Sequence, residues 1–181
     1  MSRVLRTIRL DPSDTVVFDR AAEPGEIAVV GGFMFWDGDP AALAGRARQA
    51  FRAGFLGLPG FGFSTLVTVG EAGPDEREAA LAALAAHIRA HLGAPDEDAA
   101  RAAAEEEMGF AAELASGHAP GTVIALTRSI EADGVRERFR TLKPKGDTQA
   151  LPVIGLLRTD EGAEEPAEEV DLVSLMKRGA A

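Results

Sequence analysis

Glu107 is the residue whose type and position most directly suggest chemistry. In a helix predicted from Pro95 to about Ser116, a turn of about 100° per residue gathers small and apolar side chains on one face, and Glu107 projects from the middle of that face. An unpaired buried carboxylate is costly, so it must be paired, protonated or poised for chemistry. Three interpretations stay open: an internal ion pair with an arginine such as Arg128, a functional acid or base, or a helix that is rotated or frayed.

Two histidines, His87 and His91, are four residues apart on a second predicted helix. This spacing can place two imidazoles on one metal ion. However, no glutamate follows His87 as zinc hydrolases require, and His118 is the only other histidine. We therefore expect boundary histidines and no metal site.

The glycine-rich stretch from Gly54 to Gly62 resembles a phosphate-binding loop only superficially. It lacks a Gly-Lys-Ser/Thr element and carries large apolar residues, including Phe55 and Phe61, where a phosphate cradle has small polar ones. Together with the aromatic segment that ends at Trp36, it predicts either core-lining structure or a small apolar pocket or partner groove.

Arg136, Arg138 and Arg140 form a basic row along one face of a predicted strand. A solvated sheet face balanced by Glu131 is one interpretation. The other is a surface that receives an anion, an acidic partner, or the chain's own acidic segment at 161–169.

No other constellation indicates catalysis, so we expect no catalytic residue and no cofactor. The serines at 64, 116, 129 and 174 lack the glycine elbow of a hydrolase nucleophile, and no dinucleotide fingerprint follows a strand. The chain has no cysteine, which removes disulfides, thiolate nucleophiles and cysteine metal sites.

Charge and hydropathy limit the classes of partner that we expect for this chain. A net charge of −10 argues against nucleic acid, because a phosphate backbone would meet repulsion. The first 14 residues carry three arginines and no uninterrupted apolar run, so we expect no signal peptide, no membrane partner and a cytoplasmic location.

Hydrophobic periodicity and turn residues divide the chain into elements. The strongest strand signal is Ile27–Trp36, an apolar run rich in aromatic and β-branched residues. The Gly54–Gly62 stretch is predicted to hold neither a helix nor a regular strand. The other predicted elements are strands at 3–10 and 63–69, helices at 39–54, 74–92 and 95–116, and a last short strand at 153–157.

A β-hairpin is predicted from two β-rich runs, 122–132 and 135–143, that flank Asp133-Gly134. This dipeptide favours a two-residue type I′ turn. The resulting register pairs Glu131 with Arg136 and places the arginine row on one face and the apolar residues on the other, with Arg128 facing inward.

These elements indicate an α+β fold: an antiparallel or mixed sheet of about five to six strands with three helices packed on one face. Residues 1–157 are predicted to form one domain. Residues 158–181 are predicted to be an acidic linker followed by a short amphipathic segment, since 159–169 lacks large apolar residues.

Three segments carry a family resemblance: Phe33-Met34-Phe35-Trp36-Asp37, the stretch 50–57 and Ala104-Glu105-Glu106-Glu107. On these the chain resembles an uncharacterised family of short acidic alphaproteobacterial proteins, a domain of unknown function, over residues 3 to about 145. The resemblance implies no activity. The resemblance also suggests that members of the family are encoded near genes for cofactor-dependent redox enzymes and their maturation. This gene neighbourhood would imply an accessory role.

We therefore expect a non-catalytic accessory or binding protein that acts through contact with an unidentified protein partner or through self-association. The alternative is a small-molecule-binding protein or enzyme with a pocket between the Trp36 strand, the Gly54–Gly62 loop and the Glu107 helix. A homo-oligomeric structural protein is a third hypothesis. The residues expected to bind a ligand or partner are Trp36, Phe55, Phe61, Glu107, Arg136, Arg138 and Arg140.

Overall fold

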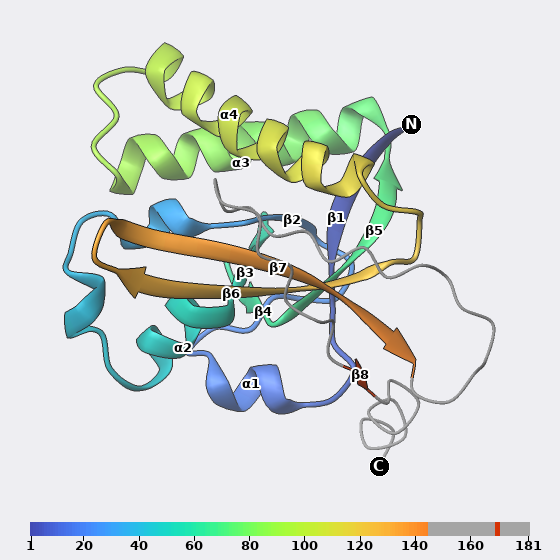
Figure 1. Ribbon diagram of the computed structural model, residues 1–181. Helices are drawn as coiled ribbons and strands as arrows, with labels where there is room; N and C mark the ends of the chain where they lie inside the picture. Colours follow the sequence, from blue (N-terminus) through green and yellow to red (C-terminus); the bar gives the residue numbers. More distant parts are fainter. Residues whose placement is uncertain (145–168, 171–181) are drawn as a thin grey trace.

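The computed structural model describes residues 1–144 and 169–170, which form an α+β fold around one large sheet (Figure 1). The strands are β1 Ser2–Ile8, β2 Ile27–Val29, β3 Phe55–Leu58, β4 Phe63–Ser64, β5 Leu66–Ala72, β6 Val123–Glu131, β7 Gly134–Pro144 and β8 Glu169–Val170. The helices are α1 Ser13–Val17, α2 Gly45–Ala53, α3 Pro74–His91 and α4 Glu97–Ser116, with 3₁₀ turns η1 Gly32–Phe35 and η2 Pro40–Ala42.

The sheet order is β4-β3-β2-β1-β5-β6-β7-β8. The first seven of these strands pair antiparallel, and the two-residue β8 joins β7 in parallel. The α+β prediction is therefore confirmed. Within residues 1–144 the predicted counts were wrong, because the sheet has seven strands and there are four α-helices.

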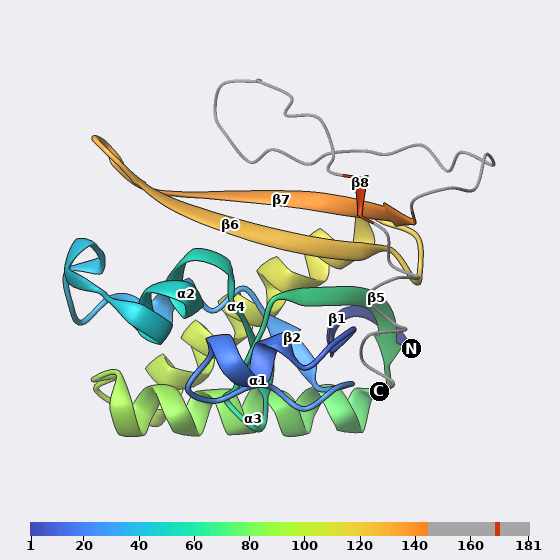
Figure 2. The same cartoon turned by 90° about the horizontal axis from the view of Figure 1, so that it is seen from below.

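The helices form two groups along the sheet. Helix α3 packs along α4, which contacts β1 and β2, whereas α2 contacts β6 and α1. Figure 1 accordingly shows α3 and α4 above the strands and α1 and α2 below them. Figure 2 shows that the long β6–β7 hairpin extends past the other strands of the sheet and lies above α2 in this view.

Two sequence predictions fail around β2 and β3. The apolar run from Ile27 does not continue as a strand to Trp36, because the backbone turns at Gly31 with φ +79° and enters η1. A side chain at Gly31 would lie 2.8 Å from the Leu56 Cβ, so glycine permits both the turn and the close approach to β3. The glycine-rich stretch, expected to be irregular, contains β3, which lies inside the sheet between β2 and β4.

The other helices and strands follow the sequence more closely. Helices α3 and α4 match their predicted ranges within two residues. Asp39 does act as an N-cap, but it caps η2, and α2 starts only at Gly45. The strand predicted at 63–69 is divided into β4 and β5, and the predicted strand at 153–157 lies outside the described residues.

The hairpin forms with the predicted faces but in a register shifted by two residues. Its two-residue loop is Ala132-Asp133, and Glu131 pairs with Gly134. The observed register places Arg128 opposite Glu137, so a charge meets its counter-charge, and it aligns apolar residues with apolar residues farther along. A shift of two residues preserves which side chains face inward.

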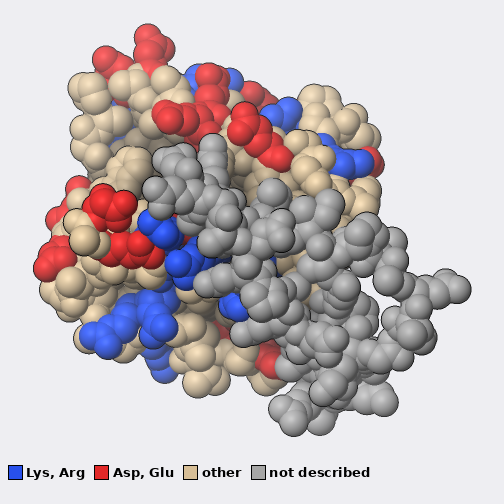
Figure 3. Space-filling model, in the orientation of Figure 1, with Lys and Arg blue, Asp and Glu red and all other residues tan. Residues whose placement is uncertain are grey.

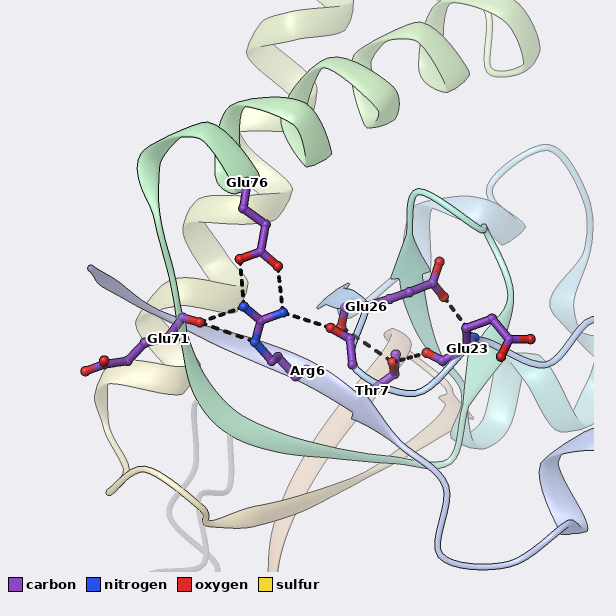
Figure 4. Close-up of polar contacts among 7 residues, drawn as sticks. Arg6, Thr7, Glu23, Glu26, Glu71 and Glu76 are labelled. Atoms are coloured by element: carbon purple, nitrogen blue, oxygen red, sulfur yellow. Dashed lines mark hydrogen bonds and ion pairs between the residues drawn. The ribbon is translucent and has the colours of Figure 1, made fainter.

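An arginine of the first strand, Arg6, ties the helical layer to the sheet (Figure 4). It donates to both carboxylate oxygens of Glu76 on α3, at 2.7 and 2.8 Å, and to the backbone carbonyls of Gly25 and Glu71. The pKa of Glu76 is held below its usual value, mainly by the hydrogen bonds from Arg6. This network joins β1, β5 and the start of α3.

Candidate functional site

A cavity of about 630 Å³ opens at the end of the molecule where the hairpin tip lies. This is within the range of about 300–1,000 Å³ typical of small-molecule sites. Its walls come from three regions that are distant in sequence: the segment that holds η1, η2 and α2, the helix α4, and the β6–β7 hairpin. The lining residues are Val30, Gly32, Phe33, Phe35, Trp36, Pro40, Phe51, Glu107, Phe110, Arg128, Asp133, Gly134, Val135, Arg136 and Glu137.

Arg128, on β6, is the most deeply buried charged residue of this region, and its side chain has no exposed surface. Its Nε donates to Glu137 Oε1 at 2.8 Å. Its Nη1 donates to the carbonyls of Phe51 and Gly54, and its Nη2 to the carbonyl of Val30. The guanidinium therefore joins β6, β7, α2 and the end of β2, and burial lowers the pKa of Arg128 against the opposing effect of Glu137 and then Glu107.

The Glu137 carboxylate reaches Arg128 because Gly32 has no side chain. A Cβ on Gly32 would lie 2.9 Å from Glu137 Oε1 and 3.6 Å from Arg128 Nε. Position 32 belongs to η1, which also carries the aromatic wall of the cavity. The glycine thus sets how closely η1 approaches the ion pair.

Glu107 faces the same cavity from α4 and is half-buried. Ala104 and Ala111, one turn before and after it, are buried, whereas Glu107 itself is only half-buried. Glu107 therefore lies at the edge of the core face of α4 and not in its middle as predicted. Burial, followed by the charges of Glu137 and Glu106, raises the pKa of Glu107 to about 7, although Arg128 opposes the shift.

No hydrogen bond or ion pair reaches the Glu107 carboxylate from residues 1–144. The ion pair considered between Glu107 and Arg128 is formed by Arg128 with Glu137 instead. Glu107 can therefore exchange a proton near neutral pH, or accept a hydrogen bond or a positive charge from a bound molecule.

Apolar side chains surround the mouth of this cavity. Trp36 is 76% exposed and makes an edge contact with Phe33, at 6.4 Å between ring centroids. On the hairpin, Ile130 and Val135 form a cross-strand pair, and each is 50% exposed. We call Trp36, Ile130 and Val135 the apolar rim.

The structure brings three of the seven predicted site residues together: Trp36, Glu107 and Arg136 all line the cavity. Phe55 has no exposed surface and packs in the core against Phe139. Phe61 lies elsewhere, where its ring stacks on His87 at 4.1 Å.

The other two predicted residues share the strand face of Arg136 but do not line this cavity. Arg138 lies 3.7 Å from Glu131, which also pairs with Arg136 at 3.1 Å. Arg140 lines a second cavity of about 310 Å³ beside Asp14 of α1. The acidic segment proposed as an occupant of the arginine row lies, apart from Glu169, outside the described residues.

Glu137 and Gly32 are two of the site residues that the sequence analysis missed, together with Asp133 and the four phenylalanines that line the cavity. A signal for Glu137 existed, since it alternates with Val135 and Phe139 on the inward face of its strand. No signal in the sequence marked Gly32, because its role depends on a neighbour about a hundred positions away.

The described residues give less support to a metal site at His87 and His91. The rings of His87 and His91 lie 4.6 Å apart, and no group of three potential metal ligands occurs within the described part of the chain. Burial, followed by the charge of His91, lowers the pKa of His87. None of the described helices combines the length and apolar character needed to cross a membrane.

Comparison with known proteins yields a family whose function is unknown. A family model described as a family of unknown function, DUF6505, matches residues 1–158. No curated protein and no solved structure matches the chain.

Proposed function

We propose, for a chain that belongs to the DUF6505 family of unknown function, that the cavity beside Glu107 binds a small organic molecule. The observation that carries this proposal is the Glu107 carboxylate, which is half-buried at the cavity wall without a hydrogen-bond or ion-pair partner among residues 1–144. A carboxylate with only a structural role is expected to be paired when it is removed from water.

The neighbouring ion pair strengthens the argument. Arg128 lies close enough to influence the charge of Glu107, yet its hydrogen bonds go to Glu137 and to backbone carbonyls. Within residues 1–144 the cost of holding Glu107 in this environment is therefore offset only in part, by the nearby charge of Arg128. Binding of a molecule that complements Glu107 would offset it.

A single tryptophan makes the proposal directly testable. Trp36 is the only tryptophan and the chain has no tyrosine, so the intrinsic fluorescence comes from the cavity rim. We expect members of a small-molecule library to change Trp36 emission saturably, with dissociation constants that Glu107→Gln weakens at least tenfold.

Glu106→Gln is the matched control, because Glu106 is the preceding residue and is exposed. It should change the dissociation constants less than twofold. Hits should also raise the unfolding temperature of Trp36→Phe, which excludes an optical artefact. A library in which no compound distinguishes the two glutamate variants would contradict the proposal.

The apolar rim favours a second candidate function, contact with a protein partner or a second copy of this chain. Trp36, Ile130 and Val135 are large and exposed; Trp36 and Val135 line the cavity, and Ile130 is the cross-strand partner of Val135. An accessory role beside a redox enzyme would be one form of it. The Gly54–Gly62 segment is a weaker support, since all of β3 is buried.

Sedimentation over a range of concentrations tests self-association through this rim. The expected result is a concentration-dependent increase in mass that Trp36→Ser with Val135→Ser abolishes. Val16→Ser is the control, since Val16 is exposed on α1 and does not line the cavity. A mass that stays monomeric at every concentration excludes self-association.

A further inference from the structure

We propose that the ligand of this cavity is an organic cation: an ammonium group on a compact apolar or aromatic body. The inference rests on the proposed function and specifies its ligand class. It follows from how the charges lining the cavity are already paired, and from what its remaining wall is made of.

Both arginines that line the cavity have carboxylate partners. Arg128 pairs with Glu137 at 2.8 Å, and Arg136 pairs with Glu131 at 3.1 Å. Arg128 also gives its Nη donors to backbone carbonyls and exposes no surface. An anionic ligand would therefore meet only arginines whose charge is already compensated by a carboxylate.

The carboxylates show the opposite pattern. Of the three that line the cavity, only Glu137 has an ion-pair partner in the described part of the chain. Glu107 lies on the α4 wall and Asp133 on the hairpin loop, so a cation between them would meet negative charge from two sides. Figure 3 shows acidic side chains both over the upper helices and at the left edge, where the hairpin tip lies.

The rest of the wall is suited to an ammonium group with an apolar body. Five aromatic rings line the cavity: Phe33, Phe35, Trp36, Phe51 and Phe110. A cation over an aromatic face is attracted by the ring quadrupole, most strongly by tryptophan. The same rings would bury the apolar part of the ligand.

Protonation provides a signature that mere burial of an apolar molecule would not produce. Because the pKa of Glu107 is raised to about 7, a large share of the free protein carries a proton there at pH 6. A bound cation favours the ionised carboxylate, so binding should release this proton and strengthen as pH rises from 6 to 8. The charged groups that face this position are Glu106 on α4, Arg128 on β6, and Glu137, Asp133 and Arg136 on the hairpin.

The test uses three probes of one shape that differ in charge: 2-phenylethylamine, 2-phenylethanol and 3-phenylpropionate. Binding to the full chain is followed by Trp36 fluorescence and by calorimetry in two buffers of different ionisation enthalpy. We expect the amine to bind at least tenfold more tightly than the carboxylate. Its affinity should rise at least threefold from pH 6 to pH 8, and protons should be released at pH 6.

Variants identify the carboxylate responsible. Glu107→Gln should weaken amine binding at least tenfold and abolish the proton release. Glu106→Gln removes only a neighbouring charge that helps to raise the pKa of Glu107, so it should change the affinity less than twofold and retain the proton release. Circular dichroism and the unfolding temperature establish that each variant is folded.

Each remaining outcome is decisive. If the carboxylate or the alcohol binds as well as the amine, the ligand class is overturned while the proposed small-molecule site stands. Amine binding that Glu107→Gln leaves unchanged also overturns the inference. If none of the three probes binds, the inference fails for compact aromatic ammonium ions, and the library experiment decides the proposed function separately.

Discussion

Two arginines, Arg6 on β1 and Arg128 on β6, organise opposite regions of this molecule in different ways. Each donates to one glutamate of another element and to backbone carbonyls. The Arg6 side chain is 23% exposed and engages both oxygens of Glu76, with no other carboxylate involved (Figure 4). Arg128 is fully buried, engages one oxygen of Glu137, and has Glu107 nearby without a direct bond.

This difference separates a structural tie from a candidate site. Around Arg6 one cation meets one carboxylate, and both are bonded in a bidentate pair. Around Arg128 two carboxylates share the field of one cation, and only Glu137 is bonded to it. The excess negative charge lies at a cavity wall, where a ligand can reach it.

The largest expected effect comes from replacing the two arginines. Arg128→Met leaves buried carbonyls and Glu137 without their donor, and should lower the free energy of unfolding by about 3 kcal/mol or more. Arg6→Met should cost only about 1 kcal/mol, because water can replace part of its bonding. Urea denaturation followed by circular dichroism measures both. Equal losses would contradict the contrast between a buried and a solvated network.

Gly32→Ala tests how closely η1 approaches the ion pair. The new Cβ would lie 2.9 Å from Glu137 Oε1, so η1 or the carboxylate must shift and the ion-pair geometry is disturbed. We expect a loss of about 1 to 2 kcal/mol in the free energy of unfolding. Gly38→Ala is the control, because nothing lies within 4 Å of a Cβ at Gly38. A neutral Gly32→Ala would show that the ion pair tolerates displacement.

Glu107→Gln should change the pH dependence of stability in a defined direction. Because the pKa of Glu107 is raised from 4.5 to about 7, the folded state binds the proton more tightly, and stability falls as pH rises through this window. The variant should therefore exceed the wild type by on the order of 1 to 2 kcal/mol at pH 8, after allowance for partial exposure, and match it near pH 4.5. Circular dichroism melts at several pH values test this. A variant less stable than the wild type at pH 8 would refute it.

Glu76→Gln should show the opposite sign and the smallest effect. The pKa of Glu76 is lowered, so its contribution is present above pH 4.5 and is lost as the pH falls below that value. Since the pair is partly exposed, the loss at pH 7 should be below about 1 kcal/mol and should shrink in high salt. The same melts, repeated at two salt concentrations, measure it. A loss that persists unchanged in high salt would indicate a buried interaction.

Much of the fold was predictable from local signals. Capping residues and helical periodicity located α3 and α4, and alternation assigned the inward and outward faces of the hairpin, including the inward position of Arg128. Local signals failed at β2 and β3. There the path of the chain depends on the close approach of Gly31, just after β2, to Leu56 of β3, a contact between two segments that neither sequence shows by itself.

For the site, residue type was predictable and pairing was not. Glu107 was recognisable from its place on an apolar helix face, but the partner of Arg128 depended on the hairpin register. The register was predicted from the Asp133-Gly134 dipeptide alone. The observed register is shifted by two residues and places Arg128 opposite Glu137. A turn preference of two residues is outweighed by many cross-strand pairs.

The sequence by itself determined the α+β class, the two long helices, and the presence of a carboxylate on an otherwise apolar face of the second. Only the tertiary structure decided that Arg128 donates its hydrogen bonds to Glu137 and to three backbone carbonyls. Glu107 therefore lies at the wall of a cavity without a hydrogen bond from Arg128. The physical reason is one of range. Helix periodicity depends on neighbours three or four residues away, whereas the charge balance at Glu107 depends on groups brought together from η1, α2, α4 and the hairpin.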